Sequence, residues 1–172
     1  MPPNWKLTIL RTSKEAILRP MLGCDITQAY AEGLNNPVVF KFLSPPPPGG
    51  WNAENMRGYV VDNWNSDSNA LFGIYYRHQL VGTTRLHGIE WNRSRAVLGI
   101  CIFDTSVWGM GLATSTIIRI VEFATDELGL SEINAGIKQG NVGSCEAFKK
   151  AGFRQIENSP NGDLQYSWTK TL

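Results

Sequence analysis

Seven consecutive residues that follow an apolar segment have the composition of a phosphate-binding loop. Small residues let the backbone approach a ligand closely, and the free N–H groups and the dipole at the start of a helix favour an anion. Neither common phosphate-binding pattern is present, since Thr114 replaces the third glycine of a dinucleotide fingerprint and no Gly-Lys-Ser/Thr occurs. The segment predicts either a phosphate-bearing ligand or only a glycine turn before a helix. Its residues are Trp108, Gly109, Met110, Gly111, Leu112, Ala113 and Thr114.

The hydrophobic pattern around this loop predicts which elements must position it. Residues 95–103 are apolar on both faces from Leu98 onward, which is typical of a strand in the middle of a sheet. An apolar stripe from Ile117 to Leu128 predicts a long helix after the loop, and residues 141–152 predict a shorter one. Further helices are expected after an N-cap at Asp25 and over 53–65. Strands are expected over 5–10, 16–22, 70–76, 80–87, 131–138, 153–156 and 164–169.

The order of these elements indicates one domain of the mixed α/β, or α+β, class. The chain has 172 residues, which is close to the length of one typical domain. The proline-rich segment 44–50 is read as an internal loop, because about 43 residues are too few for a separate stable domain.

Composition excludes several classes of function. Sixteen Lys and Arg balance fifteen Asp and Glu to a net charge of +1, which argues against a nucleic-acid surface or a polybasic membrane anchor. Three scattered cysteines without a Cys-x-x-Cys pair make a metal site improbable, and their odd number fits the reducing cytoplasm. No segment approaches the length of a membrane span, about 20 apolar residues.

The region from 98 to 153 resembles the acetyl-CoA-binding core of GNAT-superfamily N-acetyltransferases. The resemblance rests on LGICIF, DTSVWGMGLAT, INAGIK and GNVGSCEAFKKAGF in this order. The superfamily pattern is Gln/Arg-x-x-Gly-x-Gly/Ala, and Trp108, Gly111 and Ala113 take its first, fourth and sixth places. The Trp-Gly-x-Gly-x-Ala version resembles the branch of RimJ/RimL-type ribosomal-protein N-terminal acetyltransferases and amino-sugar acetyltransferases. Upstream segments ILRP, AYAEGLNNP and TRLHGIEW also resemble that branch.

This resemblance implies a single N-acetyltransferase domain over residues 1–172, with the GNAT fold. That fold has a central mixed, mostly antiparallel, splayed sheet flanked by helices. The loop from Trp108 to Thr114 would bind the pyrophosphate of acetyl-CoA. Main-chain groups of Ile100, Cys101 and Ile102 would hold the pantetheine arm and polarise the acetyl carbonyl. Asn141 would bind the cofactor or merely cap a helix, and Phe148 would pack on the cofactor or in the core.

The catalytic roles implied by the resemblance are less specific. Ser144 matches the serine that faces the thioester sulfur in the RimJ/RimL-type branch, although it also suits helix capping. A tyrosine acid is excluded at Phe148, the position where other branches have one. The general base is His87 or Glu90, with Asp104 and water as alternatives, since residues 95–97 lack a carboxylate. Strand parity places His87 and Glu90 on opposite faces.

We therefore expect direct acetyl transfer from acetyl-CoA to a primary amine, without a metal. The acceptor is expected to be a protein N-terminal α-amine, with an amino-sugar nucleotide or another small amine as the alternative. A non-catalytic acetyl-CoA-binding module is the alternative from another class. A homodimer is possible, and neither nucleic acid nor membrane is expected as a partner.

Overall fold

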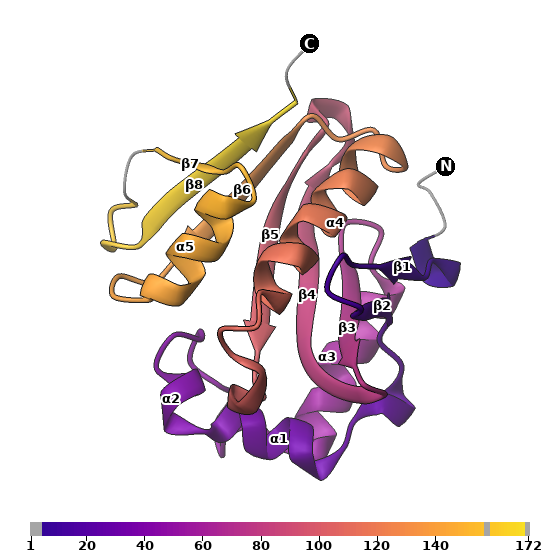
Figure 1. The fold of residues 1–172 in the computed structure, drawn as a ribbon. Helices are drawn as coiled ribbons and strands as arrows, with labels where there is room; N and C mark the ends of the chain where they lie inside the picture. The colour runs from indigo at the N-terminus through magenta and orange to yellow at the C-terminus, as the bar shows by residue number, and fades with distance from the viewer. Residues whose placement is uncertain (1–4, 157–158, 171–172) are drawn as a thin grey trace.

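A single eight-stranded sheet organises the described chain, which comprises residues 5–156 and 159–170 of the computed structural model. The strand order is β1-β2-β3-β4-β5-β6-β8-β7, and all neighbouring pairs are antiparallel except β5 and β6 (Figure 1). The expected mixed, mostly antiparallel sheet is thus confirmed. The strands are β1 Leu10–Arg11, β2 Ile17–Pro20, β3 Ala70–Tyr76, β4 Gln79–Glu90, β5 Arg95–Ile102, β6 Glu132–Ile137, β7 Arg154–Gln155 and β8 Leu164–Thr169.

Five described helices cover the two faces of this sheet. They are α1 Gln28–Asn35, α2 Pro37–Phe40, α3 Ala53–Asn65, α4 Leu112–Asp126 and α5 Val142–Lys150. Helices α4 and α5 lie on one face, and α3 lies on the other (Figure 1). Strand residues such as Phe72, Leu86 and Leu98 pack with α4 in the larger core, while Leu71 packs with α1 and α3 in the smaller one. Alternating strand residues therefore serve two different cores.

The N-terminal segment differs from its predicted strand over 5–10. Residues Trp5–Leu7 form a 3-10 turn, and only Leu10 and Arg11 pair with β2. The ring of Trp5 packs against Trp64 and Phe72, with centroid distances of 5.9 and 5.6 Å. This tertiary packing of one large ring outweighs the local apolar pattern.

The predicted N-cap at Asp25 is also wrong. Thr27 caps α1, and its side chain accepts a hydrogen bond from the N–H of Tyr30 at 3.2 Å. Asp25 instead forms an ion pair with Arg19 through both carboxylate oxygens. Burial opposes ionisation of this carboxyl, but the hydrogen bonds from Arg19 and from the N–H of Leu22 still lower its pKa. A carboxylate with a nearby guanidinium is thus used for tertiary pairing rather than for capping.

The parallel strands β5 and β6 separate part-way along their length. They pair from Arg95 with Glu132 to Val97 with Asn134, and no register pair follows. Strand β5 nevertheless continues to Ile102 and β6 continues to Ile137. The expected splay of the sheet is therefore present. Beyond Val97 on β5 and Asn134 on β6, the facing edges of the two strands are unpaired.

Candidate functional site

A cavity of about 560 Å³ lies where β5 and β6 separate. Its volume is in the range of small-molecule sites. It is bounded by the end of β5, the loop before α4 with the first turn of that helix, one face along α5, and the end of α2 with the residues that follow it. The lining residues are Val39, Phe42, Leu43, Ile100, Cys101, Ile102, Val107, Trp108, Gly109, Gly111, Leu112, Ala113, Thr114, Gly140, Asn141, Val142, Gly143, Ser144, Glu146, Ala147 and Lys150. The structure thus brings most of the predicted cofactor residues together.

The loop before α4 presents free main-chain donors to this cavity. Gly111 caps the helix in the left-handed region at φ +80°, and Gly109 has φ +78°. Such angles are accessible to glycine and unfavourable for most other residues. The first regular bond of the helix runs from the N–H of Ser115 to the carbonyl of Gly111, so the N–H groups of residues 112–114 precede the bonded ladder. An anion at this position would meet both these donors and the positive end of the dipole.

One predicted member of the loop points elsewhere. Met110 does not line the cavity. It borders a separate hollow together with Lys14 and Tyr76. The main chain of Met110 belongs to the loop, but the structure does not bring its side chain to the cavity.

The end of β5 offers main-chain groups to the gap in an alternating pattern. The N–H of Phe103 donates to the carbonyl of Val81 on β4 at 3.0 Å. Because consecutive residues of a strand direct these groups to opposite sides, Ile100 and Ile102 direct theirs away from β4. Cys101 directs its own main-chain groups toward β4, so only its side chain reaches the cavity. Trp108 Nε1 donates to the carbonyl of Ile102 at 2.9 Å, which leaves the main chain of Ile100 free for a ligand.

The side chain of Cys101 is not suited to nucleophilic chemistry. Burial raises the pKa of its thiol to about 12. The thiol therefore stays protonated at neutral pH, as expected of a cysteine that serves as a small packing residue.

Helix α5 places Asn141 and Ser144 at the cavity. Asn141 caps the helix, because its Oδ1 accepts a hydrogen bond from the N–H of Ser144 at 3.2 Å. Its Nδ2 group has no hydrogen bond among the described residues and is available to a ligand. Phe148 lies elsewhere, with 2% exposure in the core and its ring 4.9 Å from that of Phe153. The structure does not bring Phe148 to the cavity. Of the two positions predicted for it, on the cofactor or in the core, Phe148 occupies the core.

The predicted general bases lie away from the cavity. His87 pairs in register with Val97, and Thr84 pairs with Ile100, the first residue of β5 that lines the cavity, so three residues, or about 10 Å of strand, separate His87 from the cavity level. Burial and the nearby Arg85 lower the pKa of His87 to about 4. Glu90 forms ion pairs with Arg95 at 2.7 Å and Arg93 at 3.4 Å. The structure therefore brings neither side chain to the reacting region.

Asp104, the remaining side chain considered as a general base, has a local structural role. Asp104 accepts hydrogen bonds from the N–H and the hydroxyl of Ser106, at 2.9 and 2.6 Å. It caps the 3-10 turn Thr105–Val107 and does not line the cavity. Of the proton acceptors predicted from the sequence, water therefore remains, because the side chains of His87, Glu90 and Asp104 do not line the cavity.

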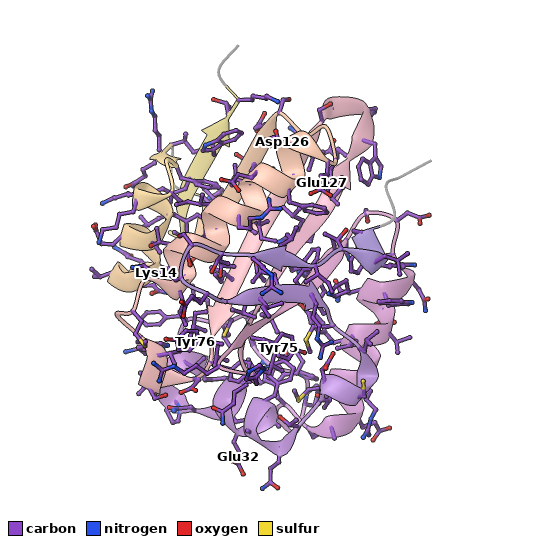
Figure 2. The ribbon with its side chains drawn as sticks, turned by 45° about the vertical axis from the view of Figure 1, so that its right-hand side comes forward. Lys14, Glu32, Tyr75, Tyr76, Asp126 and Glu127 are labelled. Carbon is purple, nitrogen blue, oxygen red and sulfur yellow. The ribbon has the colours of Figure 1, made fainter. Side chains whose placement is uncertain are left out.

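Two lysines that the sequence did not single out lie near the loop. Lys150 lines the cavity from α5, on the same helix face as Gly143 and Ala147. This helical spacing is the feature of the sequence that could have indicated Lys150. Lys14 belongs to the turn between β1 and β2, which Figure 2 shows near the start of α4. A Cβ atom on Gly111 would lie 3.5 Å from Lys14 Cε. This proximity depends on the docking of a distant hairpin, and no local pattern indicates it.

Neither a metal-binding cluster nor a membrane-spanning helix occurs among the described residues. Within residues 5–156 and 159–170, no cluster of three or more His, Cys, Asp or Glu could hold a metal ion. The helices in the same ranges are too short or too polar to cross a bilayer.

Comparison with protein families identifies the domain. The family model described as "Acetyltransferase (GNAT) domain" matches residues 16–154. The chain belongs to this family. The matched range contains the separating strands, the α4 loop and the α5 cap, so the family relation covers the whole candidate site of this GNAT domain.

Individual relatives resemble the GNAT domain to different extents. It is 31% identical to the probable N-acetyltransferase YjcK of Bacillus subtilis over 91 residues, which are 52% of this chain and 50% of that protein. The chain thus matches only about half the length of that curated relative. Mycobacterium smegmatis RimJ, solved with a CoA disulfide, has a TM-score of 0.78 at 17% identity, covering 98% of this chain and 90% of that one. RimL, a ribosomal L7/L12 α-N-protein acetyltransferase solved with coenzyme A, has a TM-score of 0.81 at 16% identity, covering 94% and 98%. At these identities the solved structures establish the fold.

We predict that Gly111→Val weakens acetyl-CoA binding while the fold persists. Valine at φ +80° is strained by about 1–3 kcal/mol, and relief of that strain would turn the helix N–H groups away from the cavity. The dissociation constant, measured by calorimetry, is expected to rise about tenfold or more. Gly162→Val is the matched control, because Gly162 has φ +85° in the turn before β8 and lies outside the cavity. Equal affinities of the Gly111 variant and the wild type would reject the loop as the phosphate site.

A second prediction separates the two roles of Asn141. Asn141→Asp keeps an oxygen that caps α5 but replaces the Nδ2 donor with a negative charge. It should retain the melting temperature and weaken acetyl-CoA binding by about tenfold. Asn141→Ala should also lose about 1 kcal/mol of stability with the cap. Wild-type affinity of the Asp variant would leave Asn141 with a capping role alone.

Proposed function

We propose that this GNAT domain is an acetyl-CoA-dependent N-acetyltransferase that transfers acetyl directly to a protein N-terminal α-amine. The observation that carries the proposal is the shared cavity. The open main chain of Ile100, the donors at the start of α4 and the side chain of Ser144 all border it. A thioester ligand with a phosphate-rich end needs donors at both of its ends. The N–H groups at the start of α4 suit the phosphates, and the main chain of Ile100 and the hydroxyl of Ser144 suit the thioester.

Each group has a distinct task in this proposal. The loop from Trp108 to Thr114 binds the pyrophosphate, with Lys14 and Lys150 as nearby cations. The main chain of Ile100 orients the pantetheine arm and polarises the acetyl carbonyl by fixed donors. Asn141 binds the cofactor through Nδ2. Acetyl-CoA supplies an activated acyl group, and the neutral amine attacks it.

Ser144 is the proposed hydrogen-bond donor that stabilises the leaving thiolate, which then takes its proton from water. Its side chain is half-buried at the cavity wall, one helical turn from the cap of α5. A hydroxyl at this position can donate to a sulfur that gains negative charge in the transition state. The proton of the attacking amine passes to water in this proposal, because His87, Glu90 and Asp104 do not line the cavity. Glu146 does line it, but this carboxylate already pairs with Lys149 at 3.4 Å.

We predict that Ser144→Ala lowers kcat by about tenfold or more and leaves the KM for acetyl-CoA nearly unchanged, since the lost interaction develops in the transition state. Steady-state thiol release measures both constants. Ser131→Ala is the control, because Ser131 is an exposed serine immediately before β6 and lies outside the cavity. A normal kcat for the Ser144 variant would remove this residue from the mechanism.

The protein N-terminus is preferred as acceptor for two reasons. RimL is a ribosomal-protein α-N-acetyltransferase by name, and its fold aligns with nearly all of this chain. The Trp-Gly-x-Gly-x-Ala loop and the Asn141 and Ser144 spacing resemble the same branch. Amino-sugar acetyltransferases share that resemblance, so a small amine is the competing acceptor.

The deciding experiment mixes the protein and acetyl-CoA with a panel of amines and follows thiol release. The panel contains peptides with free α-amines, the same peptides with blocked α-amines, and amino-sugar nucleotides. We expect release only with free α-amines, and mass spectrometry should place the acetyl group there. Turnover of sugars alone would reject the peptide acceptor. Tight acetyl-CoA binding without release on any amine would indicate a non-catalytic binding module.

A further inference from the structure

The sheet face opposite α4 and α5 has an open strip beside the gap. Val97 and Gly99 on β5 and Asn134 on β6 are half-exposed, and Gly136 is exposed, whereas the alternate residues Ala96 and Leu98 are buried. A Cβ atom on Gly99 would meet only the carbonyl oxygen of Arg85, at 4.0 Å. The floor of this strip therefore has room for a ligand above it.

Cys101 belongs both to the strip face of β5 and to the lining of the cavity. This residue has the same strand parity as Gly99, so its side chain lies on the same face, and it also lines the cavity. A molecule on the strip can thus approach the end of the gap from the face opposite α4. An acceptor placed there would lie across β5 from a ligand held at the α4 loop.

Arg85 lies at the border of this strip. It pairs in register with Gly99 and has the same parity, so its side chain projects on the strip face. Its guanidinium carbon lies over the ring of Tyr59, 5.4 Å from the centroid. Arg85 also hydrogen-bonds the side chain of Tyr59, and because a guanidinium has five N–H groups, the others remain available to a ligand.

The charge of Arg85 is not balanced locally. Among the described arginines, four are half-buried, and Arg19, Arg95 and Arg119 each have a carboxylate within 4.0 Å. For Arg85 no such carboxylate is present in the described chain. Glu132 lies toward the far end of the strip, where it accepts a hydrogen bond from Asn134 at 2.6 Å. A partly desolvated guanidinium without an anion favours a ligand that supplies one.

We propose that Arg85 binds a carboxylate of the acceptor, so that the preferred substrate is a protein N-terminus with Asp or Glu among its first two residues. The register supports this spacing, because Arg85 lies opposite Gly99, next to the free main chain of Ile100. A carboxylate held there is about one amino-acid residue away from an amine at the gap. The inference rests on the acetyl transfer proposed above and adds its specificity.

The test compares two peptides that differ only in Glu or Gln at the second position. The wild-type protein should acetylate the Glu peptide with kcat/KM about ten- to a hundredfold higher. Arg85→Gln should lose this preference, and Arg85→Lys should retain part of it, because lysine keeps the charge without the planar fork. Arg11→Gln is the matched control and should keep the full preference, since Arg11 is exposed on β1 at the other end of the sheet.

Further arms separate this inference from the proposed function. Equal rates with both peptides, or an unchanged preference in Arg85→Gln, would overturn the role of Arg85 even if acetyl transfer occurs. Turnover of free aspartate or glutamate, but of no peptide, would retain the carboxylate contact and overturn the peptide source. If no amine releases thiol, calorimetry with the acetyl-CoA-loaded protein still decides. The Glu peptide must then bind more tightly than the Gln peptide, and Arg85→Gln must abolish the difference.

Discussion

The separation of β5 from β6 is the constraint on which the rest of this structure depends. The strands pair over three residues each and then diverge, although both continue. Unpaired main-chain groups are costly when they are buried without a partner. Trp108 satisfies the carbonyl of Ile102, and the main chain of Ile100 faces the gap without a strand partner. A sheet of this kind keeps hydrogen-bonding capacity for a ligand at its centre rather than at its rim.

Each side of the gap is supported by the helix that follows its strand. Helix α4 follows β5, and its residues Leu112, Ile117 and Ile120 are almost fully buried in the larger core. Helix α5 follows β6, and Phe148 anchors it against Phe153. Because close-packed cores resist displacement, the N-terminal ends of both helices are held at the mouth of the gap. The glycines of the α4 loop and the cap at Asn141 therefore present donors in fixed positions.

Two chemically different faces of the sheet border β5 beside the gap. On the α4 side the cavity gathers backbone donors and Lys150. On the other side the strip is floored by Gly99 and Gly136 and bordered by Arg85. Two substrates that approach from opposite faces can meet at the end of β5 without competing for the same volume. This arrangement suits direct transfer, in which both substrates are bound together.

The sequence by itself determined those features that depend on neighbouring residues. The periodicity of 53–65 and the apolar run from residue 95 predicted α3 and β5 correctly, and the glycines at 109 and 111 predicted a loop before a helix. The tertiary structure decided which groups share the site. It paired Glu90 with Arg95, buried Phe148, and placed Lys14 beside Gly111 and Arg85 opposite Gly99. Backbone periodicity is a local property, whereas strand neighbours and the point where their pairing stops are set by packing between segments far apart in the chain.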